Sequence, residues 1–401
     1  MKKRVYTTPA GTRDELQGRS ALLRRTEGYL LACFEGRGYF EVRTPTLEYY
    51  DVFTGDESTI DHTKIYKLID GGEILAIRPD STAPVGRLAA TKLASMPLPL
   101  RLSYCQTVLR CGGGNRGART ETRQCGVELV GADGLWADLE LAEAALSALK
   151  ASGLEGYKLE LGHAGIFGGI LKSISLDSGD REEVMRLTAS KNYSALKDLL
   201  QNYREENPEA VDAICRLPEL FGGAEVFEAA EALIKEPEAL AGLSALKALY
   251  VELEKLGFGE DVLLDLGLVN GMDYYTGVVF GAYAYGTGEQ VLSGGRYDGL
   301  YKNYGENMTA SGFAVNVDAV CDALEKTGGK AAMPVSDVLV CFDPANAQEA
   351  FAFARELRAV GKRVEIAACP ASEGKKIALD KHIARSVYFG NDLSEEGGIG
   401  E

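Results

Sequence analysis

Four short stretches combine acidic, hydroxyl, amide and aromatic side chains in patterns that suit recognition of a small polar ligand. They are residues 78–84, 104–131, 267–277 and 293–298. In the first, Asp80 and Thr82 stand two residues apart, and on a strand such a pair points to one side. Together they could accept hydrogen bonds from an ammonium group. A solvated strand end explains this stretch equally well.

The second stretch has the alternation of a strand with two different faces. Gln124, Gly126 and Glu128 fall on one face, and Val127 and Leu129 fall on the other. A Gln and a Glu above an apolar underside suit a polar ligand bound over a sheet. An amphipathic strand that faces water would show the same alternation.

The third and fourth stretches are rich in glycine. Tyr274 and Tyr275 follow an acid, and each offers a ring and a hydroxyl that can hold an imidazole by contact and by a hydrogen bond. Residues 293–295, Ser-Gly-Gly, are expected to form a turn where a small ligand could approach the backbone closely. Ordinary turn chemistry is the alternative for either stretch taken singly.

Helices and strands must position these residues. Apolar spacing predicts helices over about 14–37 and 137–150, with short strand-like runs at 65–69, 74–77 and 102–104 between them. Long helices and consecutive strands together favour an α+β fold in which helices pack on an antiparallel sheet.

The pattern changes twice further along the chain. Residues from 165 to 258 are predicted to form helix after helix, and strand character returns at 262–266. After a linker near 327–334, the C-terminal part alternates as β-α-β-α-β. We therefore expect a core in two parts, 1–164 and 259–326, a helical insertion, 165–258, and a small α/β domain, 335–401.

Composition narrows the class of protein. The 401 residues are 46% hydrophobic and 25% charged, which is typical of a soluble globular protein. No apolar run of roughly 20 residues could span a bilayer, and the basic start lacks the apolar run of a secretory signal. We expect a cytoplasmic protein. The formal net charge of −16 makes tRNA a less favoured partner, although acidity also promotes solubility.

Cysteine and histidine are too scattered for a metal site. None of the eight cysteines forms a Cys-x-x-Cys pair, and the three histidines lie far apart in the sequence. We expect reduced, mostly buried thiols, no metal and no cofactor.

Taken in order, five motifs resemble histidyl-tRNA synthetase over about residues 5–325. They are Tyr-Phe-Glu-Val-Arg-Thr-Pro (39–45), Arg-Pro-Asp-Ser-Thr-Ala (78–83), Gln-Cys-Gly-Val-Glu (124–128), Leu-Val-Asn-Gly-Met-Asp-Tyr-Tyr (268–275) and Gly-Gly-Arg-Tyr-Asp (294–298). The resemblance implies a class II synthetase-like antiparallel sheet flanked by helices, with a helical insertion. It also implies a dimer formed partly through the segment that ends at Pro45.

The resemblance further implies a histidine pocket, whose members would be Asp80, Thr82, Gln124, Glu128, Tyr274 and Tyr275. By motif, Asp80 and Thr82 would meet the α-ammonium group, and Gln124 the backbone end of the ligand. Glu128 and Tyr275 would meet the imidazole, with Tyr274 nearby.

The residues that a synthetase needs for ATP are replaced. Asn270 stands where the synthetase motif carries an arginine, and Ala319 replaces the arginine that ends motif 3. In motif 2, Ala118 and Thr122 stand where an arginine and an adenine-stacking aromatic are found. Arg110 survives, so it could keep a residual anion contact.

A synthetase-like chain with a histidine pocket and a degraded ATP site resembles the ATP phosphoribosyltransferase regulatory subunit family, as does the Arg-Pro-Asp-x-Thr-Ala-Pro pattern at 78–84. That resemblance implies a subunit without catalytic residues or aminoacylation activity. Its partner would be the short-form catalytic subunit of the first enzyme of histidine biosynthesis, and L-histidine would be the feedback inhibitor. A homodimer within a hetero-oligomer, without tRNA, is expected.

Two alternatives remain from the sequence. One is a divergent histidyl-tRNA synthetase, which histidine-dependent ATP–pyrophosphate exchange would reveal. The other is a histidine-sensing adaptor for some other enzyme or RNA, which co-purification of the bound partner would identify.

Overall fold

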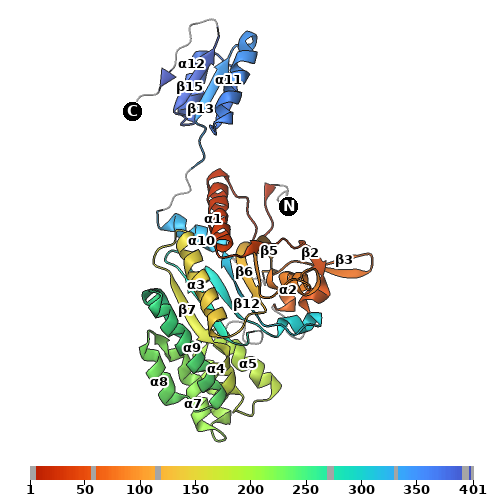
Figure 1. Cartoon of the computed structure of the whole chain (residues 1–401), viewed down its shortest axis with the longest axis vertical. Coiled ribbons are helices and arrows are strands. Elements are labelled where there is room, and N and C mark those ends of the chain that lie inside the picture. The colour runs from red at the N-terminus through yellow and green to blue at the C-terminus, as the bar shows by residue number, and fades with distance from the viewer. Residues whose placement is uncertain are drawn as a thin grey trace. The chain divides into compact units, whose positions relative to one another are not determined.

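The structure, a computed structural model, describes residues 6–55, 60–112, 119–268, 275–328 and 333–390, and the backbone of 397–398 (Figure 1). By its internal contacts the chain divides into two compact units. The larger comprises Met1–Glu15 and Leu22–Lys330, and the smaller comprises Leu16–Ala21 and Ala331–Glu401. In the part of the chain that is described, no helix is both long and apolar enough to cross a membrane.

A sheet of nine strands, counted over the described residues, forms the centre of the larger unit. In spatial order the strands are β1 (Phe40–Glu41), β5 (Leu100–Leu109), β6 (Glu121–Val130), β12 (Ala310–Asn316), β11 (Leu292–Arg296), β10 (Val278–Tyr283), β7 (Lys158–His163), β9 (Val262–Asp265) and β8 (Phe221–Gly222). The six strands from β5 to β7 are antiparallel, as predicted.

The edges of this sheet add parallel pairs to the predicted antiparallel strands. β1 runs parallel to β5, and β9 runs parallel to β7. Parallel neighbours require a long crossover connection, and the predicted helical segment supplies it between β7 and β9. The sheet is therefore mixed, within the predicted α+β class.

Two long helices cover the sheet close to where they were predicted. They are α1 (Gln17–Glu35) and α3 (Leu135–Ala151). Phe34 of α1 packs edge-on against Phe313 of β12, with ring centroids 5.8 Å apart. Leu146 and Leu149 of α3 are fully buried. The apolar stripe of each helix thus stabilises the part of the sheet that carries the sequence motifs.

The stretch that contains Asp80 is not a strand, and this part of the prediction is wrong. Strand β4 (Glu73–Ile77) pairs with β2 (Leu47–Tyr49) and β3 (Tyr66–Asp70) in a small sheet, and it stops before Asp80. Helix α2 (Thr82–Thr91) follows, and Asp80 Oδ1 accepts a hydrogen bond of 3.0 Å from the amide of Ala83. The carboxylate therefore satisfies a free amide in the first turn of the helix, which favours helix over strand.

Six helices connect β7 to β9. They are α4 (Ala164–Leu171), α5 (Ser178–Ala189), α6 (Tyr193–Leu200), α7 (Pro208–Arg216), α8 (Glu225–Leu233) and α9 (Pro237–Lys255), with the short β8 among them in the described residues. Side chains of Asp177, Asn192 and Asn207 accept amide hydrogen bonds at the starts of three of them. These caps explain why the sequence breaks into several short helices here.

The smaller unit has the β-α-β-α-β order predicted for it. β13 (Val338–Phe342) lies between β14 (Val364–Ala367) and β15 (Arg385–Phe389), parallel to both, and β16 (Gly397–Gly398) pairs with β15. The helices α11 (Ala347–Ala359) and α12 (Ala371–Asp380) are the two crossovers. Apolar clusters lie on both faces of this sheet, as parallel strands require.

One pair of cysteines contradicts the expectation that all the thiols are reduced. Cys105 and Cys125 lie directly opposite each other on β5 and β6, with Cα atoms 4.1 Å apart, and they form a disulfide. None of the other six cysteines forms a disulfide in the described part of the chain. Strand register brings the pair together, and register cannot be obtained from cysteine spacing alone.

Candidate functional site

A cavity of about 290 Å³ lies over the middle of the large sheet. Strands β5, β6, β10, β11 and β12, the start of α2 and the segment that precedes β10 all contribute to its wall. Its polar lining comes from Asp80, Ser81, Thr82, Tyr104, Arg110, Gln124, Tyr275, Gln290, Ser293 and Tyr297. Such a mixture of acid, base, amide and hydroxyl groups suits a small molecule that carries both charges.

Gly294 and Gly312 line this cavity, and Gly295 lies next to them on β11. A Cβ at Gly295 would lie 2.8 Å from the ring of Tyr275, and one at Gly312 would lie 2.0 Å from Glu128 Oε2. Residues 293–295 therefore do not form the predicted turn but lie inside β11. Glycine is required there because the tyrosine ring rests directly on the strand.

Glu128 is the most deeply buried acid of the site, with 2% of its surface exposed. The hydroxyl of Tyr297 donates a hydrogen bond to its Oε2 atom. Burial raises the pKa of Glu128 well above its usual range; the Thr82 and Tyr104 hydroxyls oppose this rise, and Asp80 adds to it. Its Oε1 atom is buried without a hydrogen-bond partner among the described residues. A buried acceptor of this kind favours a ligand that brings an N–H group.

Tyr275 stands beside this carboxylate. Burial raises the pKa of its hydroxyl, the carboxylates of Glu128 and Asp80 add to the rise, and Arg110 opposes it. The hydroxyl therefore stays protonated at neutral pH, so it can donate one hydrogen bond and accept another.

Arg296 fixes the end of β11 next to Tyr297. Its Nη2 atom lies 2.7 Å from Asp138 Oδ1 on α3, and its Nη1 atom lies 3.4 Å from Asp298 Oδ1. Asp298 in turn accepts the amide of Ala310 at 2.9 Å. This buried network ties the Gly-Gly-Arg-Tyr-Asp motif to the neighbouring strand and helix, and so sets the position of the Tyr297 hydroxyl.

Most of the predicted residues come together. Those that line the cavity are Asp80, Thr82, Arg110, Gln124 and Tyr275. Glu128 lies just beneath its floor, against Gly312. Arg110 is held by a 2.8 Å hydrogen bond from its Nε atom to the carbonyl of Pro79. Tyr274 lies outside the described residues, as do Asn270 and Ala118.

Four lining residues were not among the predicted pocket members: Tyr104, Gln290, Ser293 and Tyr297. Of these, Tyr104, Ser293 and Tyr297 lie within stretches that the sequence motifs had singled out. Tyr104 pairs with Gly126 across β5 and β6, and a Cβ at Gly126 would lie 2.5 Å from the Tyr104 hydroxyl. Gly126 thus leaves room for the tyrosine side chain. The glycine between Gln124 and Glu128 was the signal in the sequence that a large neighbour crosses the strand there.

A second cavity, of about 280 Å³, continues from the first along the sheet. The two share Arg110, Gln124, Gln290, Ser293 and Ala314. Thr122 and Asn316 line the second cavity, and among the described residues no aromatic ring does. Asn316 Oδ1 accepts the amide of Ala319, 3.1 Å away, in the first turn of α10 (Val317–Lys326). At Ala319, where the resemblance places the motif 3 arginine of a synthetase, the first turn of α10 thus carries an acid, Asp318, and no basic residue.

Comparisons with known proteins agree with these features. A family model described as histidyl-tRNA synthetase matches residues 11–320. The ATP phosphoribosyltransferase regulatory subunit of Clostridium kluyveri is 38% identical over 360 residues, which cover 89% of this chain and 92% of the relative. The chain belongs to the ATP phosphoribosyltransferase regulatory subunit family. The regulatory subunit of Bacillus cereus is 35% identical over 374 residues, covering 92% of this chain and 88% of its own.

Solved structures confirm the fold expected of an ATP phosphoribosyltransferase regulatory subunit. A Bacillus halodurans C protein, described as an ATP phosphoribosyltransferase regulatory subunit/histidyl-tRNA synthetase, has a TM-score of 0.85 and 31% identity, covering 96% of this chain and 99% of its own. Histidyl-tRNA synthetase from Nostoc sp. PCC 7120 has a TM-score of 0.79 over 98% of this chain and 97% of its own, with 19% identity, and it shows the fold alone.

The close packing around Gly312 in this regulatory-subunit fold gives a stability prediction. Gly312→Ala should lower the free energy of unfolding by about 1–3 kcal/mol, because the new methyl group would collide with Glu128 and with the carbonyl of Val127. Gly168→Ala, in helix α4 with nothing within 4 Å, is the matched control and should be neutral or slightly stabilising. Urea unfolding measures both, and equal effects would contradict the close packing at Gly312.

Proposed function

We propose that this chain is the non-catalytic regulatory subunit of ATP phosphoribosyltransferase and that it binds L-histidine in the 290 Å³ cavity. The chemistry of the first step of histidine biosynthesis then belongs to a short-form catalytic subunit. The observation that carries the proposal is the contrast between the two connected cavities. The first gathers residues of the histidine motif, whereas the described lining of the second includes neither an aromatic ring nor a motif 3 cation, both of which ATP activation needs.

Each end of histidine has a matching group in the first cavity. Asp80 and Thr82 would meet the α-ammonium group, and Gln124 the backbone end. Glu128 and Tyr275 would meet the imidazole, and the open Oε1 acceptor of Glu128 supports this orientation. Hydrogen bonds to charged groups contribute about 1.5–3 kcal/mol each, so a few of them suffice for specific binding.

Several features argue against aminoacylation. Ala319 and Thr122 stand where a synthetase is expected to carry the motif 3 arginine and the adenine-stacking aromatic. Among the described residues, Arg110 is the cation that lines both cavities. We propose that Arg110 retains at most a weak anion contact. The net charge of −16 also disfavours tRNA as a partner.

We propose a homodimer within a hetero-oligomer. The outer face of the small sheet β2–β4–β3 supports an assembly surface, since Leu47, Tyr49 and Leu68 are 48%, 60% and 42% exposed on the same side. Sedimentation should show that Tyr49→Glu combined with Leu68→Glu lowers the mass of the assembly. An unchanged mass would exclude this face as the interface.

The regulation would pass from the cavity to the partner. We propose that histidine shifts the quaternary arrangement of the complex, with a coupling free energy of ~1–3 kcal/mol. In this proposal the core (1–164 and 259–326) holds the effector, outside the insertion (165–258) and the C-terminal domain (335–401). The experiment that tests the function is addition of this chain to a purified short catalytic subunit, in assays with and without L-histidine.

A further inference from the structure

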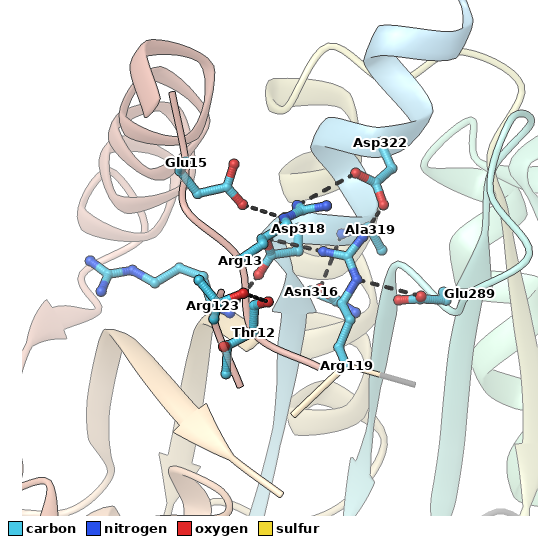
Figure 2. Close-up of polar contacts among 11 residues, drawn as sticks. Thr12, Arg13, Glu15, Arg119, Arg123, Glu289, Asn316, Asp318, Ala319 and Asp322 are labelled. Carbon is cyan, nitrogen blue, oxygen red and sulfur yellow. Dashed lines mark hydrogen bonds and ion pairs between the residues drawn. The ribbon is translucent and has the colours of Figure 1, made fainter. Parts of the chain in front are cut away.

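An ion-pair cluster lies beside the second cavity, and one of its members, Glu289, is part of the cavity wall. Figure 2 shows the contacts of this cluster. Arg119, just before β6, is its centre. The guanidinium Nη1 lies 3.2 Å from Asp318 Oδ1, Nη2 pairs with Asp322, and Nε lies 3.5 Å from Glu289 Oε1. The side chain of Arg119 is 18% exposed, so these pairs are well shielded from solvent. Three carboxylates thus surround one guanidinium group.

A second arginine joins the cluster from the N-terminal segment. Arg13 Nη2 lies 3.3 Å from Asp318 and 3.8 Å from Asp322, and its Nε atom lies 2.5 Å from Glu15. The segment before it is also tied to the sheet, since the amide of Thr120 donates to the carbonyl of Gly11 at 2.9 Å. Residues 6–15 therefore lie as a strap across the start of β6.

The cluster is next to the second cavity. Glu289 lines the second cavity, and Asn316, two residues before Asp318, does so as well. Asp318 and Asp322 lie on the first two turns of α10, next to Ala319 (Figure 2). Two guanidinium groups here face four carboxylates among the described residues; the members are Arg13, Arg119, Glu15, Glu289, Asp318 and Asp322. We call this set the Arg119 cluster.

We propose that the Arg119 cluster is an internal closure beside the second cavity. In it the chain's own carboxylates occupy the guanidinium groups that a bound polyphosphate would need. Carboxylates and phosphate oxygens bind guanidinium in the same planar geometry, so they compete for the same donors. Carboxylates that are already in place act at a high effective concentration. The excess of negative charge also repels an incoming polyphosphate.

The closure goes further than the loss of two arginines, because it also holds the guanidinium group of Arg119 in ion pairs with the chain's own carboxylates. It also joins four segments that are distant in sequence: the strap, the start of β6, the turn before β11, and α10. A polyphosphate could bind the guanidinium group of Arg119 only by displacing carboxylates from these ion pairs.

The test uses inorganic pyrophosphate as the probe and the full chain. Combining Asp322→Asn with Glu289→Gln leaves Arg119 with Asp318 alone, and isothermal titration should then show pyrophosphate binding at least about tenfold tighter than in the unaltered chain. Glu306→Gln removes an exposed carboxylate elsewhere in the larger unit and is the matched control; it should leave pyrophosphate affinity unchanged.

Adding Arg119→Gln to the double variant should abolish the gain, because the freed guanidinium is its source. Glu289→Gln alone should show a smaller gain in pyrophosphate affinity. Because the Glu289 side chain is 48% exposed, this single variant should fold even if the double variant does not. Hydrogen exchange of the strap amides should also be faster in the double variant. Pyrophosphate affinity that stays the same in both folded variants, or a gain that survives loss of Arg119, would overturn the proposal. Histidine is not used, so this result is independent of the histidine pocket.

Discussion

Replacing Glu128 by glutamine should weaken L-histidine binding about a hundredfold or more, as measured by isothermal titration. Glutamine keeps the size of the side chain and can still accept the hydrogen bond of Tyr297. It loses the carboxyl group and places an amide at the buried acceptor Oε1. Removing one partner of a buried hydrogen bond costs about 1–3 kcal/mol, and a hundredfold corresponds to ~3 kcal/mol.

Two further variants make this result interpretable. Tyr275→Phe removes the second proposed imidazole contact and should weaken binding by a smaller factor, of about tenfold. Glu306→Gln, at an exposed position, should leave the affinity unchanged. If Glu128→Gln and Tyr275→Phe both bound histidine as tightly as the unaltered chain, the proposed pocket would be wrong.

The purified chain should catalyse histidine-dependent ATP–pyrophosphate exchange at least about ten-thousandfold more slowly than a working histidyl-tRNA synthetase. Removal of one stabiliser of transition-state charge typically costs about a hundred- to a thousandfold in rate. Such losses need not be additive, yet the chain lacks more than one of these groups at the same site.

A working histidyl-tRNA synthetase assayed in parallel is the control for this experiment. The second cavity, with Thr122 and Asn316 in its wall and no aromatic ring in its described lining, is the structural reason for the expected loss. Exchange within about tenfold of the working enzyme would favour the alternative of a divergent synthetase.

The fold could be predicted because its signals are local or follow the order of the motifs. The helix at 137–150 and the strand through 124–128 follow from periodicity, and the structure confirms both. Asp80 was placed on a strand because its two-residue spacing from Thr82 fits one, whereas the capping bond to Ala83 starts a helix. Parallel pairing at the sheet edges depends on crossovers that a strand pattern does not encode.

The site was predictable in composition but less so in geometry. The motifs identified Gln124 and Tyr275, yet Tyr104 enters the cavity only because β5 pairs in register with β6. The same register joins Cys105 to Cys125. In the Arg119 cluster, Arg13 and Asp318 are 305 residues apart, so no spacing in the sequence suggests their contact. Contacts between distant segments are decided by packing, and a single sequence gives no direct signal of them.

The most direct measurement is the activity of a purified short-form ATP phosphoribosyltransferase catalytic subunit on ATP and phosphoribosyl pyrophosphate when this chain is added. The account predicts that activity appears on mixing and that L-histidine suppresses it. With Glu128→Gln in the added chain, activity should still appear but should resist histidine. A catalytic subunit whose turnover does not respond to this chain, or whose histidine inhibition survives Glu128→Gln unchanged, would contradict the account.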